Sequence, residues 1–192
     1  MKVYGDSISG NCLKVKYVAD HLGLPYEWIE TSVLKGETRT AEFLAINQAG
    51  QVPIVDFGGG RILAQSNAIM RYLARGSDLI PNDPWIEAKM DEWLFWEQYS
   101  HEPAVAVLRF KIKFQQMPLS DIDPILIKKG NAALDLMERH LTEHEWMVGD
   151  RVSLADIALK AYTQFAEDAN LTLTGRPNTK RWLSGVAKAL TS

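Results

Sequence analysis

The sequence has little of what marks a secreted, membrane-spanning or nucleic-acid-binding protein. A single cysteine, Cys12, stands among 192 residues, which excludes an internal disulfide and fits a reducing compartment. No run of about 18 apolar residues occurs, so no transmembrane helix is expected. The amino end also lacks the apolar core of a secretory signal. The net charge is -3 and no basic cluster offsets it, which argues against general binding to nucleic acid or to an anionic membrane. These absences predict a cytoplasmic protein without nucleic-acid or membrane partners.

The stretch from Asn47 to Met70 combines a turn, a Val-Pro step, two short strands and the start of a helix. Proline at the first residue of a strand marks a sheet edge or a turn, because it cannot donate to the ladder, and Pro53 precedes the apolar pair Ile54-Val55. If the Val52-Pro53 bond is cis, the Val52 N–H and C=O are left free for an extended ligand. Gly58-Gly59-Gly60 predicts a hairpin loop. Ser66 is expected to cap a helix whose unpaired N–H groups favour a carboxylate.

The first eighty residues alternate between strand and helix patterns. Strands are expected at 2–5 and 26–30, and the spacing of Val15 and Val18 predicts an amphipathic helix between them. With the central stretch added, the order βαβαββα is that of a thioredoxin-like α/β domain, which we assign to residues 1–80.

Beyond the rigid tetrapeptide Pro81-Asn82-Asp83-Pro84, every pattern is helical. Aromatic residues mark a helix from Trp85 to Glu102, which Pro103 is expected to interrupt before it resumes over 104–116. The sequence therefore predicts an all-α domain over 85–192.

Several helix starts carry local capping signals. Thr40 is expected to cap a short helix, and Asp123-Pro124 supplies a cap followed by proline at the first helical position. Ser153 and Asp156 stand three residues apart, which predicts a capping box. Pro177 begins the last helix.

Three groups of residues together resemble the glutathione S-transferase family: Val52-Pro53, Gln65-Ser66 followed by Ala68-Ile69, and the Ser153-x-x-Asp156 box. The resemblance spans nearly the whole chain. It implies a thioredoxin-like glutathione-binding domain, then an all-helical domain that lines the pocket of a second substrate. It also implies glutathione as co-substrate, no metal, and a homodimer.

The resemblance assigns binding roles to individual residues. In the family the cis-proline loop pairs with the cysteinyl backbone of glutathione, which points to Val52 and Pro53. The pair at the helix start holds the γ-glutamyl end; here it is Gln65-Ser66, and Gln65 replaces an acidic residue that would pair with the ligand's ammonium group. Family members place a side-chain donor at the position of Gln51. The glycyl carboxylate is contacted from a mobile segment that here contains Lys35, Thr38 and Arg39, for which a solvated loop is an equal interpretation.

Ser9 lies at the junction of the first strand and the first helix. Thioredoxin-like redox proteins carry Cys-x-x-Cys there, whereas this chain reads Ser9-Gly10-Asn11-Cys12, which excludes a dithiol cycle within the motif. In serine-type transferases, such as the theta and zeta classes, the matching serine hydrogen-bonds the sulfur of glutathione. The alternative is that Ser9 is merely a helix cap.

Two neighbours of Ser9 are further candidates for contact with that sulfur. Ser7 lies two residues earlier in the same loop. Cys12 lies one turn into the helix, where a buried, inert thiol is expected, and it is the residue to test if the protein forms mixed disulfides with glutathione. Tyr4 lies in the first strand and is interpreted as core.

The aromatic helix over 93–114 is interpreted as one wall of the second substrate's pocket. Four of its side chains have suitable chemistry: Tyr99, His101, Arg109 and Phe110. Aromatic residues at helical spacing also form plain cores, so both interpretations stand at this point. His140-x-x-Glu143-His144 matches a zinc signature by its letters, but helix capping is favoured.

The function predicted from these residues is glutathione transfer to a small hydrophobic electrophile, with the glutathione thiolate stabilised near Ser9. A glutathione-dependent reductase or isomerase would use the same site. A module of this fold without catalysis is the alternative from a different class.

Overall fold

The computed structural model describes residues 1–191, in which two compact units are distinguished. Unit 1 comprises Met1–Ser77, and unit 2 starts at Asp78. No helix among the described residues is both long and apolar enough to cross a bilayer.

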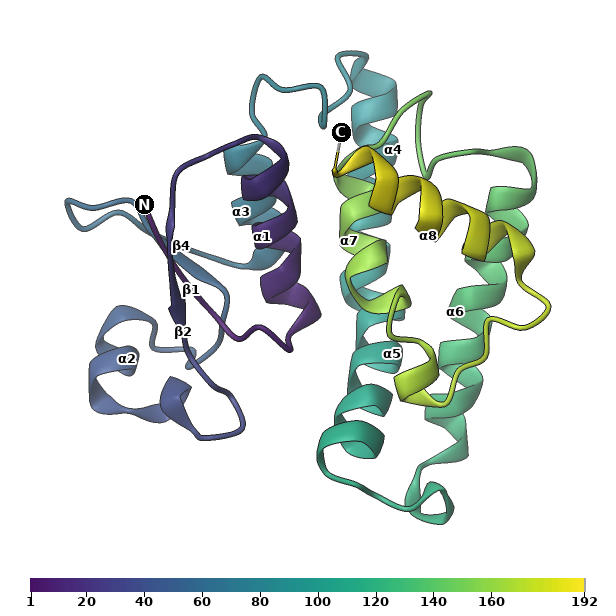
Figure 1. Cartoon of the computed structure of the whole chain (residues 1–192), viewed down its shortest axis with the longest axis horizontal. Coiled ribbons are helices and arrows are strands. Elements are labelled where there is room, and N and C mark those ends of the chain that lie inside the picture. Colours follow the sequence, from purple (N-terminus) through teal and green to yellow (C-terminus); the bar gives the residue numbers. More distant parts are fainter. Residues whose placement is uncertain (192) are drawn as a thin grey trace. The chain divides into compact units, whose positions relative to one another are not determined.

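Unit 1 is a four-stranded mixed sheet with helices on it, as predicted. The strand order is β2-β1-β3-β4; β1 runs parallel to β2 and antiparallel to β3, and β3 runs antiparallel to β4. Helices α1 and α3 lie side by side on one face of the sheet, and α2 lies away from them (Figure 1). The elements are β1 (Lys2–Gly5), α1 (Gly10–His21), β2 (Glu27–Glu30), the 3-10 turn η1 (Glu37–Arg39), α2 (Ala41–Ile46), β3 (Ile54–Asp56), β4 (Ile62–Ala64) and α3 (Ser66–Leu73).

The core of unit 1 joins the sheet to α1 and α3. Val3, Val15, Val55 and Ile69 are each 0% exposed and form one cluster, and each contributes on the order of 1.5 to 3 kcal/mol by burial. Because these residues fix the sheet against both helices, the loops at the ends of the strands are held on a rigid support.

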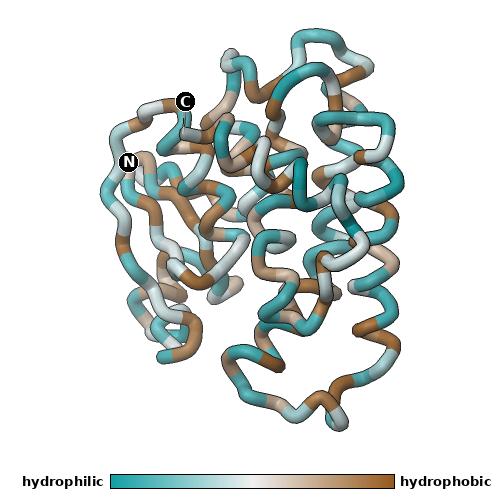
Figure 2. Tube along the Cα trace, turned by 45° about the vertical axis from the view of Figure 1, so that its right-hand side comes forward, coloured by the Kyte–Doolittle hydropathy of each residue, from teal (hydrophilic) through white to brown (hydrophobic). Residues whose placement is uncertain are grey.

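The regular elements of unit 2 are all helical over its described residues, as predicted. Hydrophobic and hydrophilic stretches alternate along its helices (Figure 2), as expected for helices that each bury one face. The elements are α4 (Pro84–Trp96), the π-helical segment η2 (Glu97–His101), α5 (Glu102–Arg109), the π-helical segment η3 (Phe110–Phe114), η4 (Leu119–Asp121), α6 (Pro124–Glu143), α7 (Leu154–Thr163), η5 (Glu167–Ala169) and α8 (Pro177–Ala189).

The expectation that Pro103 interrupts the first long helix of unit 2 is wrong. Helical backbone runs without a break from α4 through η2 and into α5. Pro103 lies in the first turn of α5, directly after a π-helical segment, and a wider turn shifts the hydrogen-bond register so that the missing proline N–H is tolerated.

The capping residues identified in the sequence mostly act as expected. Thr40 accepts a hydrogen bond from the Phe43 N–H, and Asp123 accepts one from the Ile125 N–H. Ser153 and Asp156 form a reciprocal capping box at α7. Ser66 is the exception, because the N-cap of α3 is the preceding residue, Gln65, and Ser66 is already helical.

Candidate active site

The register of the sheet brings three separate segments to one end of unit 1. Tyr4 pairs with Ile54 and Ile54 pairs with Ala64. Because β3 runs antiparallel to β1 and β4, the residues that follow β1 and β4 and those that precede β3 are neighbours at that end of the sheet. These are the loop from β1 to α1, the start of α3 and the Val52-Pro53 step. Ser9, Val52-Pro53 and Gln65-Ser66 lie on these three segments.

Asp6 organises the loop between β1 and α1. Its side chain is 3% exposed, and its two carboxylate oxygens accept hydrogen bonds from the N–H groups of Ile8 (3.1 Å) and Val33 (2.8 Å). The Ser9 N–H donates to the Asp6 carbonyl at 2.9 Å. Sequence reasoning missed this role, although an aspartate whose side chain accepts from a backbone N–H two residues on is a common turn pattern.

Ser9 takes the N-cap position of α1 with extended backbone, φ -84° and ψ 122°. Its side chain makes no capping hydrogen bond to the helix. The hydroxyl therefore does not cap the helix backbone as the alternative interpretation would have it, although the Ser9 backbone begins the helix; its hydrogen bond within α1 is with the Cys12 thiol.

Ser7 is bound to the end of β2. Its N–H and its hydroxyl both donate to one carboxylate oxygen of Glu30, at 2.9 and 3.0 Å, and the Trp28 indole N–H donates to the other at 2.7 Å. Burial alone would raise the pKa of Glu30, but these hydrogen bonds outweigh it and hold the pKa below its ordinary value. Glu30 stays ionised at neutral pH and keeps the Ser7 hydroxyl directed toward itself.

Cys12 is fully buried, as expected for an inert thiol. The Asp6 N–H donates to its Sγ at 3.3 Å. Burial raises the pKa of Cys12 to about 11, against smaller opposing effects from hydrogen bonds with Ser9 and Asp6. The side chain is therefore a neutral thiol at physiological pH.

The loop before β3 lies at the same end of the sheet as the β1–α1 loop. The Val52-Pro53 peptide bond is cis, Pro53 is buried, and the Gln51 side chain is exposed. The Asn47 side-chain amide donates to the Gln51 carbonyl at 2.8 Å and so shapes this loop.

At the start of α3, Gln65 is exposed and has a left-handed φ of 72°. Such a conformation costs a residue other than glycine on the order of 1 to 3 kcal/mol and is typical of functional sites. Ser66 is 5% exposed, and its hydroxyl donates to Oδ1 of Asn11 on α1 at 3.0 Å. The first turns of α1 and α3 are thereby joined directly.

The three predicted contacts for the glycyl carboxylate differ in their surroundings. Lys35 and Arg39 are exposed, whereas Thr38 is 3% exposed. Gly50 packs against Arg39 and the Thr38 carbonyl, and a Cβ there would lie 2.4 Å from Arg39 Nη1. The structure thus brings Arg39 to the loop that leads into Gln51 and Val52. Lys35 contributes to the field that acts on Glu30.

The four residues predicted for the second-substrate pocket fall into two environments within unit 2. Tyr99 is 88% exposed and Phe110 is 37% exposed. His101 is 0% exposed and lies 3.0 Å from the Thr163 hydroxyl, and Arg109 stacks on the Phe165 ring at 3.8 Å. The first pair is accessible, and the second pair belongs to the interior of the unit; the substrate-binding role of all four stays a prediction.

The two histidines of the zinc-like signature contact backbone near the end of α6. His140 Nε2 lies 3.0 Å from the Met147 carbonyl, and His144 Nδ1 lies 2.8 Å from the His140 carbonyl. Their rings stack with 4.2 Å between centroids. Burial and the neighbouring His144 lower the pKa of His140.

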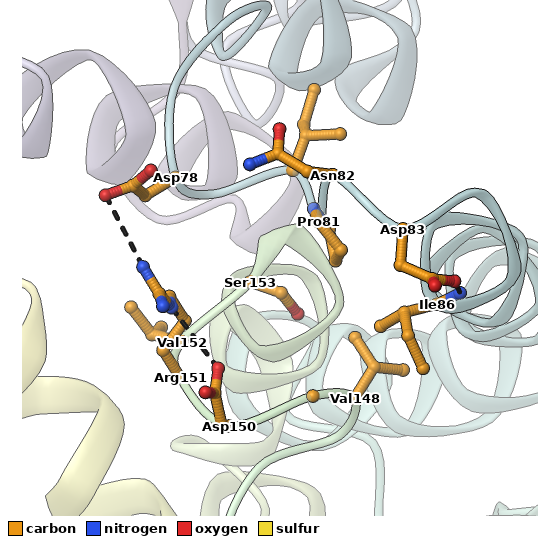
Figure 3. Close-up of a pocket in the computed structure, with 12 residues that line it drawn as sticks. Asp78, Pro81, Asn82, Asp83, Ile86, Val148, Asp150, Arg151, Val152 and Ser153 are labelled. Atoms are coloured by element: carbon orange, nitrogen blue, oxygen red, sulfur yellow. Dashed lines mark hydrogen bonds and ion pairs between the residues drawn. The ribbon is translucent and has the colours of Figure 1, made fainter.

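A cavity of about 410 Å³ opens in unit 2 among the segment before α4, the first turn of α4 and the loop that precedes α7. Its apolar wall includes Ile86 and Val148, and at its edge Arg151 lies between Asp78 and Asp150, at 3.5 and 3.3 Å (Figure 3). None of the four predicted pocket residues lines this cavity.

Comparison with known proteins identifies the family. Models of the glutathione S-transferase N-terminal and C-terminal domains match residues 8–75 and 123–189. Glutathione S-transferase 3 of Zea mays is 30% identical over 97% of this chain and 89% of its own length. The chain belongs to the glutathione S-transferase family. Glutathione S-transferase GstB of Escherichia coli K12 is 31% identical over 94% of this chain and 89% of its own length.

A solved glutathione S-transferase from Pseudomonas fluorescens has a TM-score of 0.91 and 42% identity, covering 95% of this chain and 92% of that one. The similarity therefore extends over the sheet, α1 to α3 and the helical unit, as in glutathione S-transferases generally. Ser9, Val52-Pro53 and Gln65-Ser66 all fall within the segment that matches the N-terminal glutathione S-transferase domain.

Proposed function

We propose that the protein is a glutathione transferase that binds glutathione in unit 1, stabilises its thiolate with the Ser9 hydroxyl and transfers it to a small hydrophobic electrophile. The observation that carries the proposal is the position of Ser9: its hydroxyl does not cap α1, and it lies at the same end of the sheet as Val52-Pro53 and Gln65-Ser66. Glutathione is the co-substrate, and no metal takes part.

One hydroxyl and one helix start supply enough free energy for this role. A thiol with a pKa of about 8.5 must lose about two units, or about 3 kcal/mol, to be mostly ionised at neutral pH. A hydrogen bond to a charged acceptor contributes roughly 1.5 to 3 kcal/mol, and the N-terminus of a helix adds roughly 0.3 to 1 kcal/mol. Together they match the requirement, so no general base is needed.

The rest of glutathione is held by backbone and by polar side chains, of which Ser66 and Thr38 are buried and the others are exposed. The cysteinyl backbone pairs with Val52 and Pro53, as in an added β-strand. The γ-glutamyl carboxylate takes the unpaired N–H groups at the start of α3, next to Gln65 and Ser66. Four further side chains are proposed for the glycyl end and its surroundings: Lys35, Thr38, Arg39 and Gln51.

The electrophile is proposed to bind against the helical unit, where Tyr99 and Phe110 offer exposed aromatic surface. His101 and Arg109 would act from the interior by holding the helix that carries those rings. The single cysteine favours a reducing, cytoplasmic compartment, and the family favours a homodimer as the active form.

The test is the pKa of the bound glutathione thiol, measured by thiolate absorbance near 240 nm against pH. We expect Ser9→Ala to raise this pKa by about one to two units, because the hydroxyl donor is lost. The kcat/KM for 1-chloro-2,4-dinitrobenzene at pH 6.5 should fall about 10- to 100-fold. The Kd of S-methylglutathione, which has no ionisable thiol, should change less than about twofold.

Ser7→Ala is the matched control, because it removes a hydroxyl that already donates to Glu30. It should leave the thiol pKa within about 0.3 units. An unchanged pKa in Ser9→Ala would refute the catalytic role of Ser9. A wild-type protein that does not bind glutathione at 10 mM would instead be a module without this activity.

A further inference from the structure

Ser9 and Cys12 form a polar pair in the first turn of α1. Ser9 is the N-cap residue and Cys12 lies three residues further on, which is the spacing that makes the two side chains of a capping box neighbours. The Ser9 hydroxyl is hydrogen-bonded to the Cys12 thiol. Ser9 is half-buried, whereas Cys12 is 0% exposed. The thiol therefore lies on the inner side of the hydroxyl, where a ligand cannot touch it.

We propose that Cys12 is a positioning residue whose S–H donates to the Ser9 hydroxyl oxygen, so that the hydroxyl directs its own proton to the glutathione sulfur. This inference rests on the proposed function and adds a contact behind the Ser9 hydroxyl. A hydroxyl has one proton and two lone pairs. Once the proton is donated to a thiolate, the oxygen is left as an acceptor, and the Cys12 thiol is the group hydrogen-bonded to it.

The loop before α1 fixes the sulfur atom of Cys12. The Asp6 N–H donates to its Sγ at 3.3 Å, and Asp6 is itself held, because its carboxylate accepts from the N–H groups of Ile8 and Val33. Sulfur is a weak acceptor, so we expect this N–H to satisfy it and leave the S–H to donate. The Asp6 N–H, the Cys12 thiol and the Ser9 hydroxyl then form a chain of donors that run in one direction, in which each bond polarises the next.

This chain requires Cys12 to keep its proton. Burial raises the pKa of Cys12 to about 11, so its thiol is neutral over the pH range in which glutathione ionises. An ionised Cys12 would accept the Ser9 proton and withdraw it from the ligand. The burial of this side chain therefore serves the proposed site, because the anion forms on glutathione and not on the sulfur of the protein.

The test is the pKa of the bound glutathione thiol in Cys12 variants, measured by thiolate absorbance near 240 nm against pH. Cys12→Ala removes the S–H and should raise this pKa by about 0.3 to 0.6 units, because the Ser9 O–H is then less polarised. The kcat/KM for 1-chloro-2,4-dinitrobenzene at pH 6.5 should fall about two- to fourfold with the thiolate fraction. The Kd of S-methylglutathione, which forms no thiolate, should change less than about twofold.

Three further variants separate donation from packing. Cys12→Ser supplies a hydroxyl that can donate to Ser9 and should hold the thiol pKa within about 0.2 units of wild type. Val15→Ala, which truncates another fully buried side chain of α1 without removing a donor, is the matched control and should also hold it. The pKa in the Ser9→Ala/Cys12→Ala double variant should equal that in Ser9→Ala, because Cys12 acts only through the Ser9 hydroxyl. Circular dichroism verifies that each variant is folded.

Two results would overturn the inference while the proposed function stands. An unchanged pKa in Cys12→Ala would show that the thiol does not act on the Ser9 hydroxyl. An equal rise in Cys12→Ala and Cys12→Ser would assign the effect to packing and not to a donor. If Ser9→Ala itself leaves the pKa unchanged, the catalytic role of Ser9 fails and the inference fails with it.

Discussion

At the scale of single residues, the buried thiol of Cys12 has a defined chemical state. Burial raises its pKa to about 11 from a reference of 9.0, so at pH 8 its thiolate fraction is about 100-fold lower than that of an unfolded chain. We expect iodoacetamide at pH 8 to modify the native protein about 100-fold more slowly than the protein in denaturant, as measured by intact mass. Equal rates in the two states would contradict a buried, protonated thiol. Cys12→Ser, which leaves no thiol in the chain, gives the background.

Residues whose partners are close in sequence were predictable, and those with distant partners were not. Thr40, Asp123 and Ser153 act on N–H groups two or three residues away, so local sequence is sufficient. Asp6 also binds Val33, and Ser66 binds Asn11 across a separation of 55 residues. Local sequence predicts Ser66 as a helix cap. It cannot reveal that α1 lies beside α3 and supplies Asn11 as the partner of the Ser66 hydroxyl.

At the scale of elements, α8 is capped by a side chain from another helix. Glu138 on α6 accepts hydrogen bonds from the N–H groups of Asn178 (3.1 Å) and Thr179 (2.8 Å) and from both of their side chains. Burial alone would raise the pKa of Glu138, but these hydrogen bonds outweigh it and lower the pKa below its reference of 4.5. The stabilisation is therefore present above about pH 4.5 and is lost as the pH falls through the lowered pKa.

Glu138→Gln tests this cap. An amide accepts through one oxygen and carries no charge, so we expect a loss of about 1 to 2 kcal/mol at pH 7. For a chain of this size that loss lowers the Tm by about 2 to 8 °C. At pH 3 the difference from wild type should shrink toward zero. Glu143→Gln, at an exposed position of the same helix, should have no such effect. A loss of stability that is equal at pH 7 and pH 3 would exclude the ionised Glu138 carboxylate as the cap of α8.

The sequence could not reveal that the long helix of unit 2 continues through Pro103. Pro103 normally ends or kinks a helix because it lacks an N–H and its ring meets the preceding turn. Here the segment Glu97–His101 is π-helical, and its wider turn changes which carbonyl lacks a partner. Helix propensity is a property of the proline alone, whereas the continuity of the helix depends on the π-helical geometry of the turn before it.

At the scale of the whole molecule, the two-unit architecture was predictable because strand and helix patterns differ in period along the chain. Alternation of strands and helices before Ser77 and purely helical spacing after Asp78 follow from the order of apolar residues. The gathering of Ser9, Val52 and Ser66 at one sheet end was not readable from spacing, since it depends on the register between β1, β3 and β4. The family resemblance supplied the grouping that spacing could not.

That register leads to a prediction about where glutathione acts along the chain. Hydrogen–deuterium exchange should show added protection in the three segments 5–12, 51–54 and 64–68, because their backbone lies at one end of the sheet. At a ligand concentration of 100 times the Kd, binding adds about 2.7 kcal/mol to the free energy of any local opening that releases the ligand. The hairpin loop at Gly58–Gly60 lies at the other end of β3 and β4 and should exchange as before. Cysteinyl-glycine, which lacks the γ-glutamyl group, should protect residues 51–54 from exchange and leave 64–68 unprotected. Protection centred on the hairpin loop would contradict the prediction, because it would place the ligand at the opposite end of the sheet.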